Sequence, residues 1–258
     1  KMSKALASWA ITSQSVDKIK DMLKSAKSEI GITVPLSVFD QDHYKINFLN
    51  GTLDLRTGTL YPHDPQDFIT KLIPLEYDDK ATCPRWMKFL DEIMDHKPHL
   101  IKYLQRAVGY SLTGKTGEQV FFTCWGKGAN GKSVFLETIL NAFGADYGSN
   151  AEAKTILLRE RSGGASNDIA NLRGQRLVTV NEIPGRGRLD EAKIKELTGG
   201  DTVTCRFLYQ EPFSYKPTYK IWIRTNHKPV IDHVDNGIWR RVQLIPFTVT
   251  IPPEKQDI

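Results

Sequence analysis

The sequence predicts an α/β fold with a central, mainly parallel sheet, preceded by a mostly helical region that carries a β-hairpin. Continuous apolar runs, as expected of strands buried on both faces, occur at 120–125, 176–182 and 219–225. The first run is followed by a glycine-rich loop and then by apolar residues at helical spacing, the strand–loop–helix order of α/β units. We therefore expect a mostly helical domain at 1–115 and an α/β core at 116–258.

The composition is that of an ordinary globular protein. Of 258 residues, 40% are hydrophobic and 25% are charged, and no apolar run is long enough to span a bilayer, so we expect no membrane partner. The net charge of +5 is compatible with a polyanionic partner but is weak evidence alone. Cys83, Cys124 and Cys205 are far apart and lack metal-ligand spacing, which indicates reduced thiols in a cytoplasmic compartment.

The first 115 residues show helical patterns around one hairpin signal. Ser15 is a favourable N-cap for an amphipathic helix, and Asn50-Gly51 is a strong two-residue turn signal between two short strands. Pro84 suits the first position of another helix. Trp86 and Phe89 follow it at helical spacing, so we expect them in the core rather than in a ligand site. This region offers no recognisable catalytic group.

The loop after the first apolar run fits the phosphate-binding pattern G-x-x-x-x-G-K-[ST]. Glycines let backbone N–H groups turn inward around a polyphosphate, and the N-terminus of the following helix favours anions. Lys132 would place its ammonium on the β and γ phosphates, and Ser133 would ligate Mg²⁺. A glycine-rich turn with a chance lysine is the simpler alternative, but the flanking strand and helix favour a nucleotide site. The motif residues are Gly126, Lys127, Gly128, Ala129, Asn130, Gly131, Lys132 and Ser133.

Four later residues are candidate catalytic groups. Glu182 ends the second apolar run, and a phosphate-loop ATPase needs an acid at the tip of the strand beside the loop. Asn226 ends the third run, where an amide can hold the attacking water, although asparagine is also a frequent turn former. Arg240 and Arg241 are either surface charge or a source of an arginine that neutralises transition-state charge, usually across a subunit boundary.

A second hairpin mixes basic and aromatic residues. The stretches 202–209 and 213–216 read as its strands, and Asp190 can cap the helix before it. The mixture suits contact with single-stranded nucleic acid. Spacing alone instead favours a half-buried hairpin, with its aromatic side chains in the core and its basic ones in solvent. The residues in question are Arg206, Tyr209, Tyr215 and Lys216, with Lys195 on the preceding helix.

The order of these motifs resembles the superfamily 3 helicases of the phage and plasmid primase-helicase type, which are related to poxvirus primase-helicases. The phosphate loop alone is unspecific, but the ordered set is specific, and it covers nearly the whole chain. The matching segments are 50–55, 83–86, 109–114, 126–133, 176–182, 194–201, 225–229 and 239–241.

The resemblance implies an AAA+ ATPase core that uses ATP and Mg²⁺ and assembles as a ring, usually a hexamer, around single-stranded DNA at replication forks. It implies movement from 3′ to 5′ and replication of a phage, plasmid or related element. By this likeness Lys132 and Ser133 are the Walker A pair, Glu182 the Walker B acid and Asn226 the sensor. Either Arg240 or Arg241 would be the finger acting in trans. The hairpin with Arg206, Tyr209 and Lys216, together with Lys195, would contact DNA.

One position departs from the family pattern. Many AAA+ proteins carry two acids at the end of the Walker B strand, whereas here Asn181 precedes Glu182. Either Glu182 serves both Mg²⁺ and water, or Ser133 and solvent hold the metal. A nucleotide-gated DNA-binding module with little unwinding activity is therefore a second hypothesis, and a small-molecule kinase is a weaker third. Family members usually carry a primase domain upstream and continue beyond the core, so we expect both in the full-length protein.

Overall fold

The computed structural model describes residues 3–158, 167–183, 187–231 and 236–255, and the chain forms two compact units, Lys1–Gln41 and Asp42–Ile258. No helix in the described part of the chain combines the length and apolar content that crossing a membrane requires.

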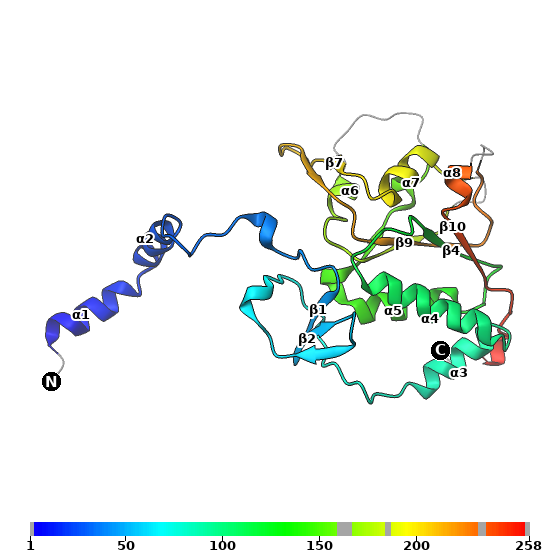
Figure 1. Cartoon of the computed structure of the whole chain (residues 1–258), viewed down its shortest axis with the longest axis horizontal. Helices are drawn as coiled ribbons and strands as arrows, with labels where there is room; N and C mark the ends of the chain where they lie inside the picture. Colours follow the sequence, from blue (N-terminus) through cyan, green and yellow to red (C-terminus); the bar gives the residue numbers. More distant parts are fainter. Residues whose placement is uncertain (1–2, 159–166, 184–186, 232–235, 256–258) are drawn as a thin grey trace. The chain divides into compact units, whose positions relative to one another are not determined.

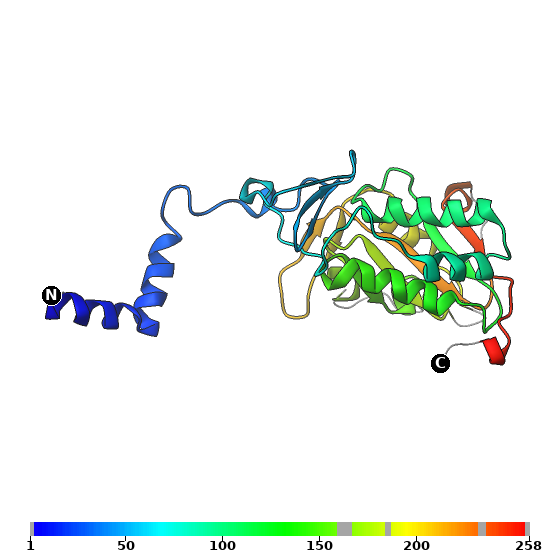
Figure 2. The same cartoon turned by 90° about the horizontal axis from the view of Figure 1, so that it is seen from below.

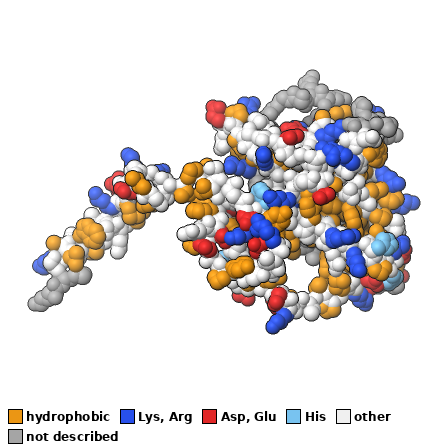
Figure 3. Space-filling view, in the orientation of Figure 1, with side chains coloured by type: hydrophobic (Ala, Val, Ile, Leu, Met, Phe, Trp, Pro, Cys, Tyr) orange, Lys and Arg blue, Asp and Glu red, His pale blue; other side chains and the backbone are white. Residues whose placement is uncertain are grey.

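The first unit contains two α-helices and a short 3₁₀-helix. These are α1 (Lys4–Ser13), α2 (Val16–Ala26) and η1 (Leu36–Val38). The predicted cap of α2 is confirmed, because the Ser15 hydroxyl accepts a hydrogen bond from the Lys18 N–H at 3.4 Å. Neither α-helix contains a buried residue, and apolar side chains lie exposed along both (Figure 3).

The second unit begins with a small antiparallel sheet of β1 (Lys45–Phe48), β2 (Gly51–Asp54) and β3 (Thr59–Tyr61). The predicted hairpin is present, but its turn lies one residue earlier, because Phe48 pairs with Gly51. The Asn50 side chain instead holds the backbone of Tyr77 through two hydrogen bonds of 2.9 Å.

The central sheet has five strands in the order β10-β4-β9-β6-β5, and every pair is parallel, which confirms the predicted fold class. β9 lies between β4, which leads to the phosphate loop, and β6, which leads to Glu182. The strand ending in the acid is therefore not directly beside the loop strand, as the sequence had indicated, but one strand further along. The strands are β4 (Phe121–Trp125), β5 (Gly148–Ala151), β6 (Leu177–Asn181), β9 (Lys220–Thr225) and β10 (Val242–Pro246).

Helices cover both faces of this sheet (Figures 1 and 2). The side chains of β9 show how, since Trp222 packs in the core under α3, α4 and α5, whereas Ile221 and Ile223 pack in the core under α6, α7 and α8. The first set is α3 (Pro84–Ile93), α4 (Pro98–Leu112) and α5 (Lys132–Tyr147), and the second is α6 (Asn167–Ala170), α7 (Glu191–Thr198) and α8 (Asn236–Trp239).

The remaining elements are short. β7 (Val203–Cys205) and β8 (Phe213–Tyr215) form a separate antiparallel pair, shorter than the strands predicted there. The 3₁₀-helices of this unit are η2 (Pro65–Asp67), η3 (Ala153–Thr155) and η4 (Pro253–Lys255). The domain boundary expected at residue 115 falls inside the second compact unit, where α3 and α4 share a core with α5, and it stays a prediction.

Candidate functional site

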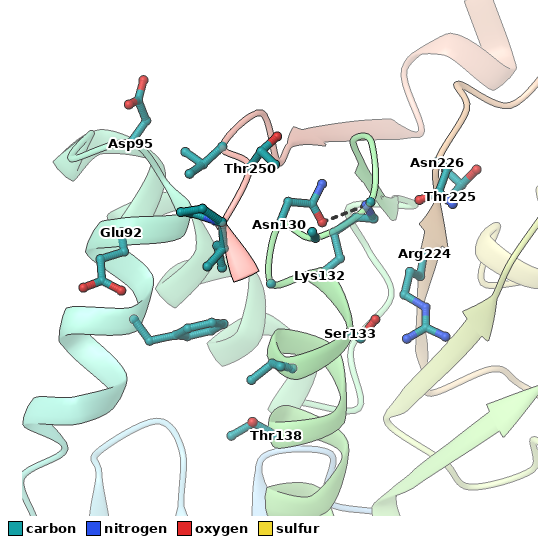
Figure 4. Close-up of a pocket in the computed structure, with 18 of the residues that line it drawn as sticks. Glu92, Asp95, Asn130, Lys132, Ser133, Thr138, Arg224, Thr225, Asn226 and Thr250 are labelled. Atoms are coloured by element: carbon teal, nitrogen blue, oxygen red, sulfur yellow. Dashed lines mark hydrogen bonds between the residues drawn. The ribbon is translucent and has the colours of Figure 1, made fainter. Parts of the chain in front are cut away.

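A wide cleft opens at the carboxyl edge of the central sheet (Figure 4). Because the strands are parallel, the segments that follow β4, β6 and β9 meet at this one edge, where α/β proteins commonly bind ligands. The cleft has a volume of about 1720 Å³, larger than the roughly 300–1,000 Å³ of a typical small-molecule pocket. Its walls come from α3 and from residues 128–134, 182–183, 224–227 and 249–252.

Two glycines of the phosphate-loop motif are required by the geometry. Gly131, just before α5, has φ +80°, and a Cβ there would lie 2.6 Å from Cγ2 of Ile93 on α3. A Cβ on Gly126 would lie 2.0 Å from the carbonyl oxygen of Phe247. Close packing of the loop against α3 and the segment after β10 therefore fixes both positions.

The loop presents unpaired hydrogen-bond donors to the cleft. Within the described residues, the backbone N–H groups of Gly128, Ala129 and Asn130 donate to no protein atom. All three residues line the cleft, and α5 begins immediately after them at Lys132. Backbone donors beside a helix N-terminus form a site suited to an anion such as a polyphosphate.

Lys132 lies inside this loop. Its side chain is 4% exposed, and its Nζ donates to the Gly126 carbonyl at 2.5 Å and to Oδ1 of Asn130 at 2.9 Å. Burial lowers the pKa of Lys132, and the nearby Arg224 adds to that shift. Nδ2 of Asn130 donates to the Phe247 carbonyl at 2.9 Å, so this asparagine both orients the lysine and ties the loop to the chain after β10.

The predicted acid and amide lie at the same cleft. Glu182 is exposed and has φ +51°, a left-handed conformation uncommon outside glycine, and its N–H donates to the Arg224 carbonyl at 3.0 Å. Asn226 is exposed one residue beyond β9, and the neighbouring Thr225 hydroxyl donates to the His227 carbonyl at 2.6 Å. The fold thus brings Lys132, Ser133, Glu182 and Asn226 to one cavity, as their motif positions predict. Figure 4 shows Lys132, Ser133 and Asn226 there.

Arg224 is a cleft residue that the sequence patterns did not single out. Its side chain is 17% exposed, and it pairs with Glu137 of α5 at 3.3 Å. The alternation of β9 could have indicated it, because Arg224 lies two residues after Trp222 and therefore on the sheet face covered by α5.

Trp86 and Phe89 of α3 form part of another wall. Trp86 stacks on Phe135 of α5 with ring centroids 5.8 Å apart, so the prediction that these aromatic residues belong to the core is correct for one side of them. Both are only partly buried and also line the cleft. Helical spacing alone cannot distinguish a side chain that lies wholly in the core from one that also lines a cleft.

Arg240 and Arg241 lie away from this cleft, near the amino edge of the sheet, where the Arg241 carbonyl accepts from the first residue of β4. Arg241 is 7% exposed and donates to the Gly237 carbonyl at 2.5 Å and to the Thr198 hydroxyl at 3.2 Å. Arg240 is exposed and donates to Oε1 of Gln119 at 2.5 Å. Neither arginine lines the cleft of its own chain.

The second hairpin has features of both interpretations of its sequence: an aromatic side chain in the core, and basic and aromatic side chains exposed to solvent. Tyr215 is buried, with its hydroxyl donating to the Ile169 carbonyl at 2.8 Å, so this aromatic faces the core. Arg206 and Lys216 are exposed, and Tyr209 is 97% exposed with φ +62° in the loop between the strands. Lys195, on α7, is partly exposed, and the α7 cap predicted at Asp190 is confirmed by a 2.9 Å bond from the Lys193 N–H.

No cluster of three His, Cys, Asp or Glu side chains that could hold a metal occurs among the described residues. A Mg²⁺ bound here would depend on phosphate oxygens and water in addition to Ser133 and Glu182, which is the usual mode for this ion.

Two family descriptions match the sequence. "D5 N terminal like" matches residues 1–95, and "Family of unknown function (DUF5906)" matches residues 124–241, which include the phosphate loop and the candidate acid.

Curated relatives are viral proteins. A protein of Acanthamoeba polyphaga mimivirus, named "Putative helicase", is 33% identical over 81% of this chain and 22% of its own length. A second of that name, from Invertebrate iridescent virus 6, is 28% identical over 92% and 25%. Primase D5 of Fowlpox virus is 26% identical over 86% and 30%. The chain thus spans between a fifth and a third of the length of these relatives.

Among solved structures, the apo C-terminal region of NrS-1 superposes with a TM-score of 0.51 at 16% identity, covering 69% of this chain and 40% of that one, a likeness of fold. The fold and matched regions define an α/β protein related to viral replication proteins. In its matched regions the chain is similar to the phage and viral primase-helicase family.

Proposed function

We propose that this chain is the ATPase core of a ring-forming DNA helicase in a viral or mobile-element replication protein. The observation that carries the proposal is the single cleft that collects the phosphate loop, Glu182 and Asn226 from three separate strands. The names of the viral relatives, helicase and primase, support a replication role for the whole protein.

The triphosphate would lie against the loop. The backbone donors of residues 128–130 would bind its oxygens, and the Lys132 ammonium would exchange its loop carbonyls for phosphate. Ser133, exposed at the start of α5, would hold Mg²⁺ together with the phosphates. The metal would neutralise charge on the transferring phosphoryl group.

Glu182 and Asn226 would act on the attacking water. Both are exposed on the cleft, so each can meet a water molecule beside the terminal phosphate. Glu182 would orient or activate it, and Asn226 would hold it in line. Asn181 leaves a single carboxylate at this strand end, which is the observation that favours the alternative of a nucleotide-gated DNA-binding module with little unwinding.

The nucleobase would lie at the α3 end of the cleft. Trp86 and Phe89 offer partly exposed aromatic faces there, and bases stack on such faces without regard to their hydrogen-bonding edges. The loop and α3 touch at Gly131, so the base and phosphate ends of the cleft are parts of one cavity.

The active site would be completed by a neighbouring subunit. Arg240 is the better candidate for the arginine finger, because it is exposed, whereas Arg241 is buried and bound by its own chain. Hydrolysis between subunits would then move the exposed loop that carries Arg206 and Tyr209. This loop would contact a DNA strand in the centre of the ring, so its motion would drive movement in the 3′ to 5′ direction.

The test is ATP hydrolysis with and without single-stranded DNA, with the mass in solution measured in the same buffer. The proposal expects a ring-sized species whose hydrolysis increases with DNA and which separates strands. An assembled ring that binds ATP but shows neither DNA-stimulated hydrolysis nor unwinding would replace it with the gated module. Failure to bind ATP at all would refute both.

A further inference from the structure

Arg224 is enclosed at the phosphate end of the cleft but is weakly held there. Its guanidinium extends from β9 toward the start of α5, at the level of Ser133 (Figure 4). The side chain is 17% exposed, and within the described ranges its guanidinium donates to Oε1 of Glu137 at 3.3 Å. A guanidinium has five N–H donors, so one hydrogen bond to Glu137 leaves most of them able to donate to another anion.

Glu137 is a poor permanent partner. Its side chain is 65% exposed, and ion pairs with solvated carboxylates contribute little to stability. A polyphosphate offers more negative charge and several oxygens that match the planar guanidinium in pairs of hydrogen bonds. Exchange of Glu137 for phosphate therefore requires breaking only one weak contact.

The backbone of Arg224 places it between the other parts of the site. It pairs in register with Asn181 of β6, its carbonyl accepts from the Glu182 N–H at 3.0 Å, and two residues later the chain reaches Asn226. Arg224 and Lys132 both line the phosphate end of the cleft, so a polyphosphate bound there would meet two cations of the same chain (Figure 4).

We propose that Arg224 is a second phosphate-binding cation of this site, acting within its own chain, and that Glu137 competes with the nucleotide for it. The inference rests on the proposed function, because it requires a polyphosphate in the cleft. It adds a regulated step to binding, since the carboxylate on α5 sets how readily the guanidinium is released.

The test is a double-mutant cycle on the affinity for ATP and for inorganic tripolyphosphate, measured by calorimetry on the full chain. Arg224→Gln should weaken both ligands roughly tenfold or more, as expected for a charge-assisted hydrogen bond. Glu137→Gln should tighten both by about two- to fivefold, and that gain should vanish in the Arg224→Gln background.

Glu92→Gln is the control for loss of a carboxylate near the site, because Glu92 lines the cleft but pairs with Lys88, at 3.9 Å, rather than with Arg224. It should change affinity less than Glu137→Gln. A similar gain from both carboxylate variants, or a Glu137→Gln gain that persists without Arg224, would mean that the carboxylates act only through overall charge and would overturn the inference.

If Arg224→Gln does not fold, Arg224→Lys replaces it and should show intermediate weakening, because a lysine keeps the charge but not the paired geometry. Unchanged affinity in a folded Arg224 variant would leave the residue a structural link between β9 and α5. The proposed function fails separately, if the unmodified chain binds neither ligand or if Lys132→Ala binds both as well as the unmodified chain does.

Discussion

The two edges of the central sheet each contain a buried lysine, and we propose different roles for the two. Lys132 at the carboxyl edge is 4% exposed, and Lys220 at the amino edge is 2% exposed. Each Nζ donates to three oxygen atoms of its surroundings. Burial lowers both pKa values, that of Lys220 to about 6. Residue type, burial and hydrogen bonding therefore do not distinguish the phosphate-binding role proposed for Lys132 from the structural role of Lys220.

The two lysines differ in the groups that surround them. Lys220 donates to the carbonyls of residues 113 and 115 and lies over the Tyr110 ring, 4.7 Å from its centroid, so it joins the end of α4 to the sheet. Arg176 beside it donates to the carbonyls of Leu112 and Lys45, at 2.6 and 2.7 Å. Lys132 instead lines an open cleft beside unpaired N–H groups, where its partners can be exchanged.

The largest expected contrast comes from removing each lysine. Lys132→Ala should abolish ATP hydrolysis while leaving the melting temperature nearly unchanged. Lys220→Met should leave carbonyl groups without a donor, which costs about 1–3 kcal/mol of the free energy of unfolding, or roughly 3–10 °C in Tm. Calorimetric melting and a steady-state ATPase assay on both variants check this. Equal losses of stability would erase the distinction between the edges.

Arg240 and Arg241, both near the amino edge, test whether an exposed and a buried cation have different roles there. Arg240→Ala should keep Tm and ATP binding but reduce hydrolysis by about 10³-fold or more, as for other arginine fingers. Arg241→Ala should lower Tm, because a buried guanidinium with three protein partners is lost. Mixing the Arg240 variant with a Glu182→Gln variant should restore some hydrolysis, since one intact site can form between unlike subunits. The reverse pattern would make Arg241 the finger.

Trp86→Ala tests the other end of the cleft. It should raise the KM for ATP by about tenfold, within the range measured for base stacking on aromatic side chains, but leave inorganic tripolyphosphate binding unchanged. Trp86→Phe should retain most of the affinity and of the packing on Phe135. Met87→Ala, an exposed neighbour on α3 that does not line the cleft, is the control. Weaker tripolyphosphate binding in Trp86→Ala would indicate a displaced loop rather than a lost base contact.

The smallest expected effect is on stability against pH. Burial, with repulsion from Lys115 and Arg176, lowers the pKa of His43 below its ordinary 6.5. The unfolded chain therefore takes up a proton before the folded one, and stability falls as pH falls below 6.5 through the folded pKa. The slope should stay below the one-proton value of about 1.4 kcal/mol per pH unit. His43→Gln should flatten this part of a urea-unfolding series. The increase of stability with pH above 6.5, which follows from the lowered pKa of Lys220, should remain.

Patterns that are local in sequence predicted the fold and the motif positions well. The order of strand, glycine-rich loop and helix, the parallel strands, and the caps at Ser15 and Asp190 each depend on neighbouring residues, and the structure contains them. Phosphate binding by the loop stays a prediction. The roles of Glu182 and Asn226 in catalysis stay predictions.

The misses depend on contacts between distant segments. The turn lies one residue earlier than predicted, and Gly51 is instead the first residue of β2, where a Cβ would lie 2.4 Å from the Tyr61 carbonyl oxygen of the third strand. The position of the Arg224 side chain depends on α5, because its partner Glu137 on that helix is 87 residues away in the sequence. The insertion of β9 between β4 and β6 is likewise a property of topology, which no single motif encodes.

The chain after β10 also determines where this core can be cut. The Phe247 N–H donates to the Trp125 carbonyl at 2.7 Å, the Phe247 carbonyl accepts from Asn130, and the Ile251 N–H donates to the Ala129 carbonyl at 2.7 Å. These hydrogen bonds hold the five residues after β10 against the phosphate loop. The smallest fragment with an ordered nucleotide loop must therefore extend past Ile251, and a fusion or protease site placed directly after Pro246 would disable the loop while sparing the sheet.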